Sequence, residues 1–219
     1  MSTTATAIIS NNLARSACMV LLASTSHAIA ADTTTPFRLD LNPVQDAQDS
    51  PTASAPREFG SAGSFRLDTT AMLANDLSDV TIGMGSVAAS WFVADGFSIS
   101  LAGEGLYASQ PTPDVGQSGG DAGGGGVSTT LRWHFLREAS WSLYAEFGIG
   151  VLATTNDIPN GGSAINFTPR AFFGASIEVA QDTRLLAAIG WFHISNAQLG
   201  ETNPAIDSLA CYLGLSFGF

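Results

Sequence analysis

Hydrophobic and polar residues alternate along most of the chain from residue 64 to the C-terminus. In the last segment, 206–219, one face carries Leu209, Cys211, Leu213, Leu215, Phe217 and Phe219. The other face carries Ser208, Ala210, Tyr212, Gly214, Ser216 and Gly218. Because successive side chains of a β-strand point to opposite faces, this period of two predicts a strand with one hydrophobic face and one face of small or polar residues.

The same pattern recurs in eight segments, which are separated by Asn, Asp, Gly and Pro. Their approximate spans are 64–74, 79–93, 97–108, 123–136, 140–153, 164–179, 183–196 and 206–219. Strands of this length, broken by turn residues, are typical of a chain of β-hairpins. We therefore predict a single all-β domain over residues 64–219.

Charged residues in these segments fall on the small-residue face, near the middle of the strands. They are Arg66, Asp68, Glu104, Arg132, Glu146, Arg170 and Glu178. In a soluble β-sandwich such residues would lie in solvent, with the bulky face turned inward. In a closed eight-stranded barrel they would pair inside a lumen that side chains fill. Their Gly and Ala neighbours suit a crowded lumen and favour the barrel.

The connections between the segments alternate in length. Three are short, at 94–96, 137–139 and 180–182, and three are long, at 109–122, 154–163 and 197–205. Aromatic residues gather at the short-turn end: Trp91, Phe92, Phe97, Trp133, Phe135, Trp141, Phe217 and Phe219. Short periplasmic turns, long outer loops and an aromatic girdle are typical of outer-membrane proteins. We predict an eight-stranded antiparallel up-and-down transmembrane β-barrel in the bacterial outer membrane.

The residues before the barrel have a different composition. Arg15, an apolar run and a small-residue site at 28–30 predict a secretory signal peptide over 1–30. Residues 31–63 are rich in Thr, Pro, Ser, Ala and Asp, which predicts a flexible periplasmic leader. With 8 basic and 19 acidic residues the formal net charge is −11, which argues against a nucleic-acid partner. Cys18 lies in the predicted signal, so no intramolecular disulfide is expected in the exported protein.

Candidate chemistry lies near the last long loop. His193 and Ser195 are two residues apart and share a strand face, which is the hydrophobic, outward face. An antiparallel return across that loop sets Asp207 opposite His193. A hydroxyl nucleophile, an imidazole base and an orienting carboxylate are the parts needed for acyl transfer. The sequence thus predicts a catalytic group on the outer wall of the barrel, where an ester within the membrane is within reach.

At these residues the chain resembles the lipid A 3-O-deacylases, outer-membrane hydrolases of the PagL type. The resemblance rests on His193-x-Ser195-Asn196-Ala197, followed by an acid fourteen residues after the histidine. It extends over about 65–219, with further similar stretches at 131–136, 141–145 and 203–209. It implies a barrel that acts on lipid A of the outer-leaflet lipopolysaccharide and releases the hydroxyacyl chain ester-linked at position 3.

The resemblance also implies roles for single residues. Ser195 would be the nucleophile and His193 the base, with Asn196 and neighbouring backbone N–H groups such as that of Ala197 as oxyanion donors. No metal and no organic cofactor is implied. The better-known members carry Glu where this chain has Asp207, so the carboxylate is one methylene shorter and the strand register must compensate.

A competing hypothesis is a structural or adhesive barrel, in which loops 109–122 and 154–163 bind a partner and the His-Ser-Asp group is incidental. The sequence also leaves open whether the barrel forms a homodimer. His134 falls on the inward face, which predicts a lumen or rim residue. Loop acids such as Asp114, Asp121 and Asp157 are expected to be solvated, although divalent cations are an alternative.

Overall fold

The computed structural model describes residues 58–200 and 202–219. The predicted signal peptide, 1–30, and the predicted leader as far as residue 57 lie outside the described residues. Within the described ranges there is no helix that is long and apolar enough to cross a membrane. The strands are β1 (Phe65–Asn75), β2 (Thr81–Ala94), β3 (Phe97–Ser109), β4 (Ala122–Arg137), β5 (Trp141–Ile158), β6 (Ser163–Phe167), β7 (Arg170–Ala180), β8 (Thr183–Ile194) and β9 (Ile206–Gly218).

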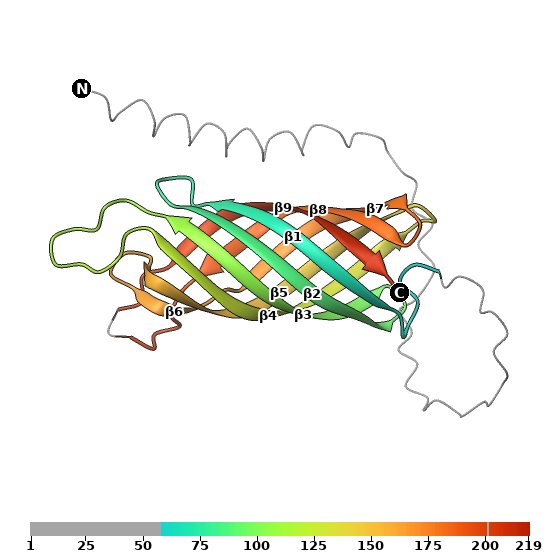
Figure 1. Ribbon diagram of the computed structural model, residues 1–219, viewed down its shortest axis with the longest axis horizontal. Coiled ribbons are helices and arrows are strands. Elements are labelled where there is room, and N and C mark those ends of the chain that lie inside the picture. The colour runs from blue at the N-terminus through green and yellow to red at the C-terminus, as the bar shows by residue number, and fades with distance from the viewer. Residues whose placement is uncertain (1–57, 201) are drawn as a thin grey trace, which may run out of the picture.

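These strands form one closed, all-antiparallel barrel (Figure 1). Strands that follow one another along the chain are paired, except that β6 and β7 both pair with β5, and the β1–β9 pairing closes the cylinder. The long connections and the β5–β6 hairpin gather at one end, and the short turns and the C-terminus lie at the other (Figure 1). The predicted fold class is confirmed.

The predicted strand 164–179 is divided into β6 and β7 by Thr168 and Pro169. The pairing with β5 has the same register on both sides of the break. Thr168 N–H donates to Gly150 O at 3.0 Å, and Pro169 O accepts from His193 N–H at 3.0 Å. The chain stays extended here, and the ladder is interrupted because proline has no N–H. β6 and β7 therefore follow one another in a single position of an eight-stranded barrel.

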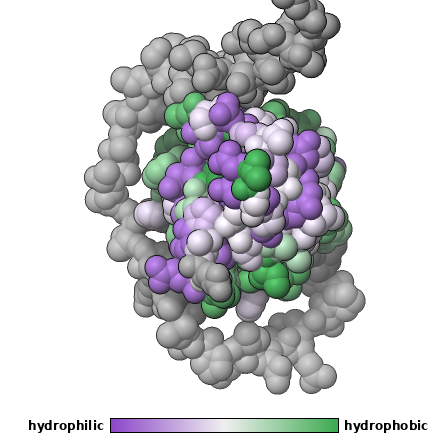
Figure 2. Space-filling model, turned by 90° about the vertical axis from the view of Figure 1, so that its left-hand side faces the viewer, coloured by the Kyte–Doolittle hydropathy of each residue, from purple (hydrophilic) through white to green (hydrophobic). Residues whose placement is uncertain are grey.

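The outer wall is apolar along the strands. Leu101, Phe147 and Phe173 are 67%, 53% and 69% exposed, although each lies within a regular strand. Figure 2, which views the loop end, shows hydrophilic residues in the centre and hydrophobic residues around the wall. Large apolar side chains turned outward from a closed barrel are what a lipid environment requires.

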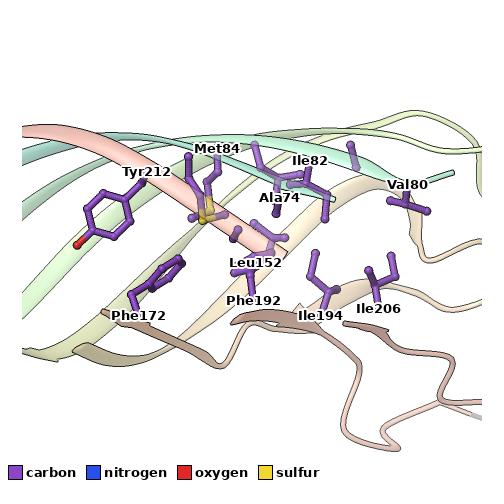
Figure 3. Close-up of a cluster of buried hydrophobic side chains, with 14 of the residues drawn as sticks. Ala74, Val80, Ile82, Met84, Leu152, Phe172, Phe192, Ile194, Ile206 and Tyr212 are labelled. Carbon is purple, nitrogen blue, oxygen red and sulfur yellow. The ribbon is translucent and has the colours of Figure 1, made fainter. Parts of the chain in front are cut away.

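The lumen is divided into an apolar part toward the loops and a polar part further in. The apolar part is the cluster of Figure 3, whose labelled members are Ala74, Val80, Ile82, Met84, Leu152, Phe172, Phe192, Ile194, Ile206 and Tyr212. In the polar part Arg132 pairs with Asp68 at 2.8 Å and with Glu146 at 2.7 Å. These side chains are at most 8% exposed, so the predicted burial of charges inside the barrel is confirmed for them.

A second buried pair joins Arg170 to Glu104 at 2.6 Å. Glu178 departs from the prediction, because its side chain is 44% exposed at the short-turn end, 3.7 Å from Arg184. Asp68, Glu104, Arg132, Glu146 and Arg170 are thus matched by opposite charges inside the barrel. Arg66 is part-buried near the short-turn end and instead donates to Ser216 Oγ at 2.7 Å and to Asp182 O at 3.0 Å.

The described end of the predicted leader packs against the short-turn end of the barrel. Gly60 O accepts from Gly96 N–H at 2.8 Å, and Gly63 N–H donates to Phe92 O at 2.7 Å. The Phe59 ring lies 3.9 Å from the Arg184 guanidinium and 5.0 Å from the His134 ring. Residues 58–63 therefore close the lumen at this end.

Two predictions about local structure are wrong. Phe92, expected in the outer aromatic girdle, is 2% exposed and packs inside against Phe59. The loop expected at 154–163 is mostly strand, since β5 continues to Ile158 and pairs with Ser163 of β6. The polar run 154–157 lacks the alternation that marks a strand, and it lies in the register shift between Ala153 and Ile158, the residues that pair with β6.

Candidate active site on the outer wall

The register of β8 and β9 brings the candidate histidine and carboxylate together. His193 lies directly opposite Asp207, with Ile194 opposite Ile206 beside them. This is the pairing expected from the sequence. Because neighbouring strands of a sheet are only about 4.8 Å apart, opposed side chains on one face can touch.

The imidazole of His193 and the carboxylate of Asp207 form a hydrogen bond, with 2.9 Å between Nδ1 and Oδ1. The His193 side chain is 19% exposed and that of Asp207 67%. When Nδ1 carries the proton and donates it to the carboxylate, the lone pair of Nε2 remains available to accept a proton. This is the tautomer that a general base requires.

Trp191 is a member of this site that the sequence analysis missed. Its indole Nε1–H donates to Asp207 Oδ1 at 2.7 Å, so one oxygen accepts from both Trp191 and His193. The Trp191 and His193 rings lie 5.5 Å apart. The available signal was the spacing of two residues, which places Trp191 on the same face as His193.

Ser195 follows on the same face, just beyond the end of β8. Its backbone pairs with Phe167, with Ser195 N–H donating to Phe167 O at 3.2 Å and Ser195 O accepting at 2.7 Å. Ser195 is 9% exposed. Within the described ranges no hydrogen bond joins the Ser195 hydroxyl to His193. Catalytic hydrogen bonds often tighten only when substrate binds, and Ser195 lies two residues after His193 on the same strand face.

Asn196 lies on the opposite side from Ser195 and is 1% exposed. Its Nδ2 donates to Thr202 O at 2.8 Å, its Oδ1 accepts from Gln198 N–H at 3.0 Å, and its own N–H donates to Asn203 Oδ1 at 3.1 Å. The amide predicted as an oxyanion donor is therefore occupied in ordering the β8–β9 loop.

Ala197 and Gln198 continue the chain with φ of 52° and 64°, the left-handed region that L-residues rarely adopt. They reverse the chain immediately after Asn196. The Ala197 N–H donates no hydrogen bond to any described residue, whereas the N–H groups of Asn196, Gln198 and Leu199 all do. Ala197 thus presents a free backbone donor two residues after Ser195.

Buried apolar side chains inside the barrel support the strands that carry the site. Phe192 and Ile194 are fully buried and Ile206 is 5% exposed, and Figure 3 shows all three among the side chains of the lumen cluster. These residues alternate with His193, Ser195 and Asp207 along the strands. A close-packed apolar interior therefore fixes the backbone that carries the outward polar groups.

Two of the acids predicted to lie in loops accept hydrogen bonds at this end of the barrel, and one of them, Asp157, lies in β5. Asp121 accepts from Gln110 N–H at 3.0 Å and from the Tyr107 hydroxyl at 2.8 Å, and these bonds lower the pKa of its carboxyl. Asp157 accepts from the Ser118 hydroxyl. Among the residues that the structure describes, no group of three or more His, Cys, Asp or Glu side chains could hold a metal ion.

A closed barrel with an apolar wall, a plugged polar lumen and long loops at one end defines an outer-membrane β-barrel protein. The family model described as lipid A 3-O-deacylase (PagL) matches residues 78–216, more than half of the chain. The chain belongs to this family and is a protein of the bacterial outer membrane. A search of curated proteins gave no match.

Several solved outer-membrane barrels are similar in outline. The crystal structure of the outer-membrane enzyme PagL has 18% identity and a TM-score of 0.49, covering 67% of this chain and 97% of that one. Outer membrane protein W of E. coli has 10% identity and a TM-score of 0.49, covering 73% and 99%. Neisserial surface protein A has 13% identity and a TM-score of 0.46, covering 71% and 96%. The family assignment rests on the family model and not on these likenesses.

Proposed function

We propose that the protein is an esterase that removes the hydroxyacyl chain from position 3 of lipid A, with Ser195 as nucleophile, His193 as general base and Asp207 as the orienting carboxylate. The family membership supports the substrate. The observation that carries the proposal is the 2.9 Å bond between His193 Nδ1 and Asp207 Oδ1 on the same outward face as Ser195. It leaves Nε2 without a hydrogen-bond partner among the described residues.

The reaction is acyl transfer in two halves. Ser195 Oγ attacks the ester carbonyl carbon while His193 Nε2 takes the hydroxyl proton, and the carbonyl electrons move onto oxygen. Collapse of the tetrahedral species breaks the bond to the sugar oxygen, which receives that proton from His193. Water then attacks the acyl-serine by the same route, releasing the hydroxy fatty acid and restoring Ser195.

The developing oxyanion needs a donor close to Ser195. Ala197 N–H is the one in the turn 196–199 that has no partner among described residues, and the left-handed turn holds it in place. The Asn196 amide is occupied by the loop. We therefore assign the oxyanion contact to the Ala197 backbone and a loop-ordering role to the Asn196 side chain.

The position of the group fits a membrane-embedded ester. Polar side chains on a lipid-facing wall are costly and are found where they have a function. His193, Ser195 and Asp207 lie toward the loop end, which long loops mark as the extracellular side. Lipid A of the outer leaflet presents its acyl esters at that level. No observation here favours the homodimer that the sequence left open.

The test is mass spectrometry of lipid A from an outer-membrane-bearing host that expresses the protein, its Ser195→Ala variant or a Ser78→Ala control. Ser78 is an exposed serine of the β1–β2 loop at the same end of the barrel. The intact protein and Ser78→Ala should remove one hydroxyacyl mass, and Ser195→Ala should lower the rate on the order of 10³-fold or more. Unchanged lipid A with all three, despite heat-modifiable gel migration, would instead support a structural or adhesive barrel.

A further inference from the structure

Trp191 differs from the other tryptophans of the barrel in its position. Trp91 and Trp133 lie near the ends of β2 and β4, and Trp141 begins β5, so all three are at the short-turn end. Trp191 lies three residues before the end of β8, at the loop end. Tryptophan is common in the interfacial belts of membrane proteins, where its N–H faces water and headgroups. The Trp191 N–H instead points to Asp207, so a belt role does not account for it.

Asp207 needs such a contact. Its side chain is 67% exposed, so packing contributes little to its orientation. Its side-chain partners among the described residues are Trp191 Nε1 at 2.7 Å and His193 Nδ1 at 2.9 Å, both on Oδ1. Without the indole the carboxylate would have one tether, and rotation about its side-chain bonds would release His193.

The Trp191 ring also restricts the movement of the His193 imidazole. The two rings lie 5.5 Å apart, with 36° between their planes. Trp191 thus restricts both partners of the pair: its N–H fixes the carboxylate oxygen, and its face borders the histidine. Both contacts come from a residue of the same strand, whose backbone is held by pairing with Leu209 and Ala171.

From this geometry we propose that Trp191 is a positioning residue, which holds Asp207 Oδ1 at His193 Nδ1 through its indole N–H. The inference rests on the proposed function for its kinetic consequence. A carboxylate that spends less time at Nδ1 leaves the imidazole free to turn or to change tautomer, and this lowers kcat. In this proposal the indole N–H and the carboxylate act on the imidazole and not on the substrate, so KM should hardly change.

The experiment measures deacylation by the purified full-length protein in detergent with purified lipopolysaccharide. Trp191→Phe, which keeps an aromatic ring and loses the N–H, should lower kcat about tenfold with little change in KM. The matched control is Trp133→Phe, another outward tryptophan of similar exposure, 48% against 41%, which should behave like the unmodified protein. Equal kcat for the two variants would overturn the proposal.

A second arm tests whether Trp191 acts through Asp207. In an Asp207→Asn background, adding Trp191→Phe should cause little further loss, because the carboxylate that the indole holds is already gone. A full tenfold loss in that background would overturn the proposal. Such additivity would mean that the indole affects activity by another route.

An NMR measurement separates this inference from the proposed function. The four indole N–H resonances of the detergent-solubilised protein can be assigned by Trp→Phe substitution. The Trp191 resonance should shift on Asp207→Asn while those of Trp91, Trp133 and Trp141 stay in place. If lipid A is untouched yet this shift occurs, the esterase proposal fails and the hydrogen bond stands; if the Trp191 resonance does not move, the positioning proposal fails whatever the activity.

Discussion

Two histidines in this barrel form hydrogen bonds of the same length and lie in opposite environments. His134 Nδ1 is 2.9 Å from Ser142 Oγ inside the lumen, where the histidine is 4% exposed. His193 Nδ1 is 2.9 Å from Asp207 Oδ1 on the outer wall. The inner residue is enclosed by the rings of Phe59, Phe92 and Tyr144, whereas the outer one keeps an edge open.

The charged side chains show the same contrast between the lumen and the outer wall. Inside, Arg132 joins Asp68 and Glu146, and Tyr212 adds a hydrogen bond to Glu146 at 3.1 Å. Each of these three charges has a partner of opposite sign and lies inside the barrel, so this network serves stability. Outside, Asp207 faces a histidine whose second nitrogen has no described partner, so the outer group can take part in chemistry.

Apart from substitution of Ser195 itself, the largest expected effect on activity comes from Asp207→Asn. An amide can donate to Nδ1, which would put the imidazole proton on Nε2 and prevent it from accepting the serine proton. We expect kcat to fall on the order of 10²- to 10³-fold, with the barrel equally resistant to heat. Activity within threefold of the unmodified protein would remove Asp207 from the mechanism.

Among substitutions in the lumen, the largest expected effect on stability comes from Arg132→Met. The substitution leaves Asp68 and Glu146 buried without their cation, which should lower the free energy of unfolding by about 3–5 kcal/mol. Urea unfolding of the detergent-solubilised barrel measures this, with the exposed Arg137→Met as control. Specific activity of the folded fraction should be unchanged; a selective loss of activity would mean that the lumen network is coupled to the outer site.

A smaller effect is expected at the closed end of the lumen. Phe59→Ala removes the ring that packs on Phe92, His134 and Arg184, which should lower the free energy of unfolding by about 1–3 kcal/mol. Urea unfolding is again the measurement. No change in stability would mean that residues 58–63 do not close the barrel as the structure has them.

The period-two pattern was enough to predict the faces, the buried charges other than Glu178, and the opposition of His193 and Asp207, because strand geometry leaves little freedom once the inner face is known. Phe59 could not be predicted, since it lies in a segment of leader-like composition and owes its place to rings and arginines from distant strands. The Trp191 bond depends on a side-chain rotamer, which alternation does not specify. The resemblance implied an oxyanion donor at Asn196, but Asn196 follows Ser195 directly, and successive residues of a strand face opposite sides.

The two histidines provide the most direct test of the account. Activity on lipid A and the free energy of unfolding should be measured on His193→Ala and His134→Ala side by side. We predict that His193→Ala loses deacylation and keeps its stability, while His134→Ala keeps its specific activity and loses stability by about 1–3 kcal/mol. Retained activity in His193→Ala, or a stable but inactive His134→Ala, would contradict the assignment of chemistry to the outer wall and of stability to the lumen.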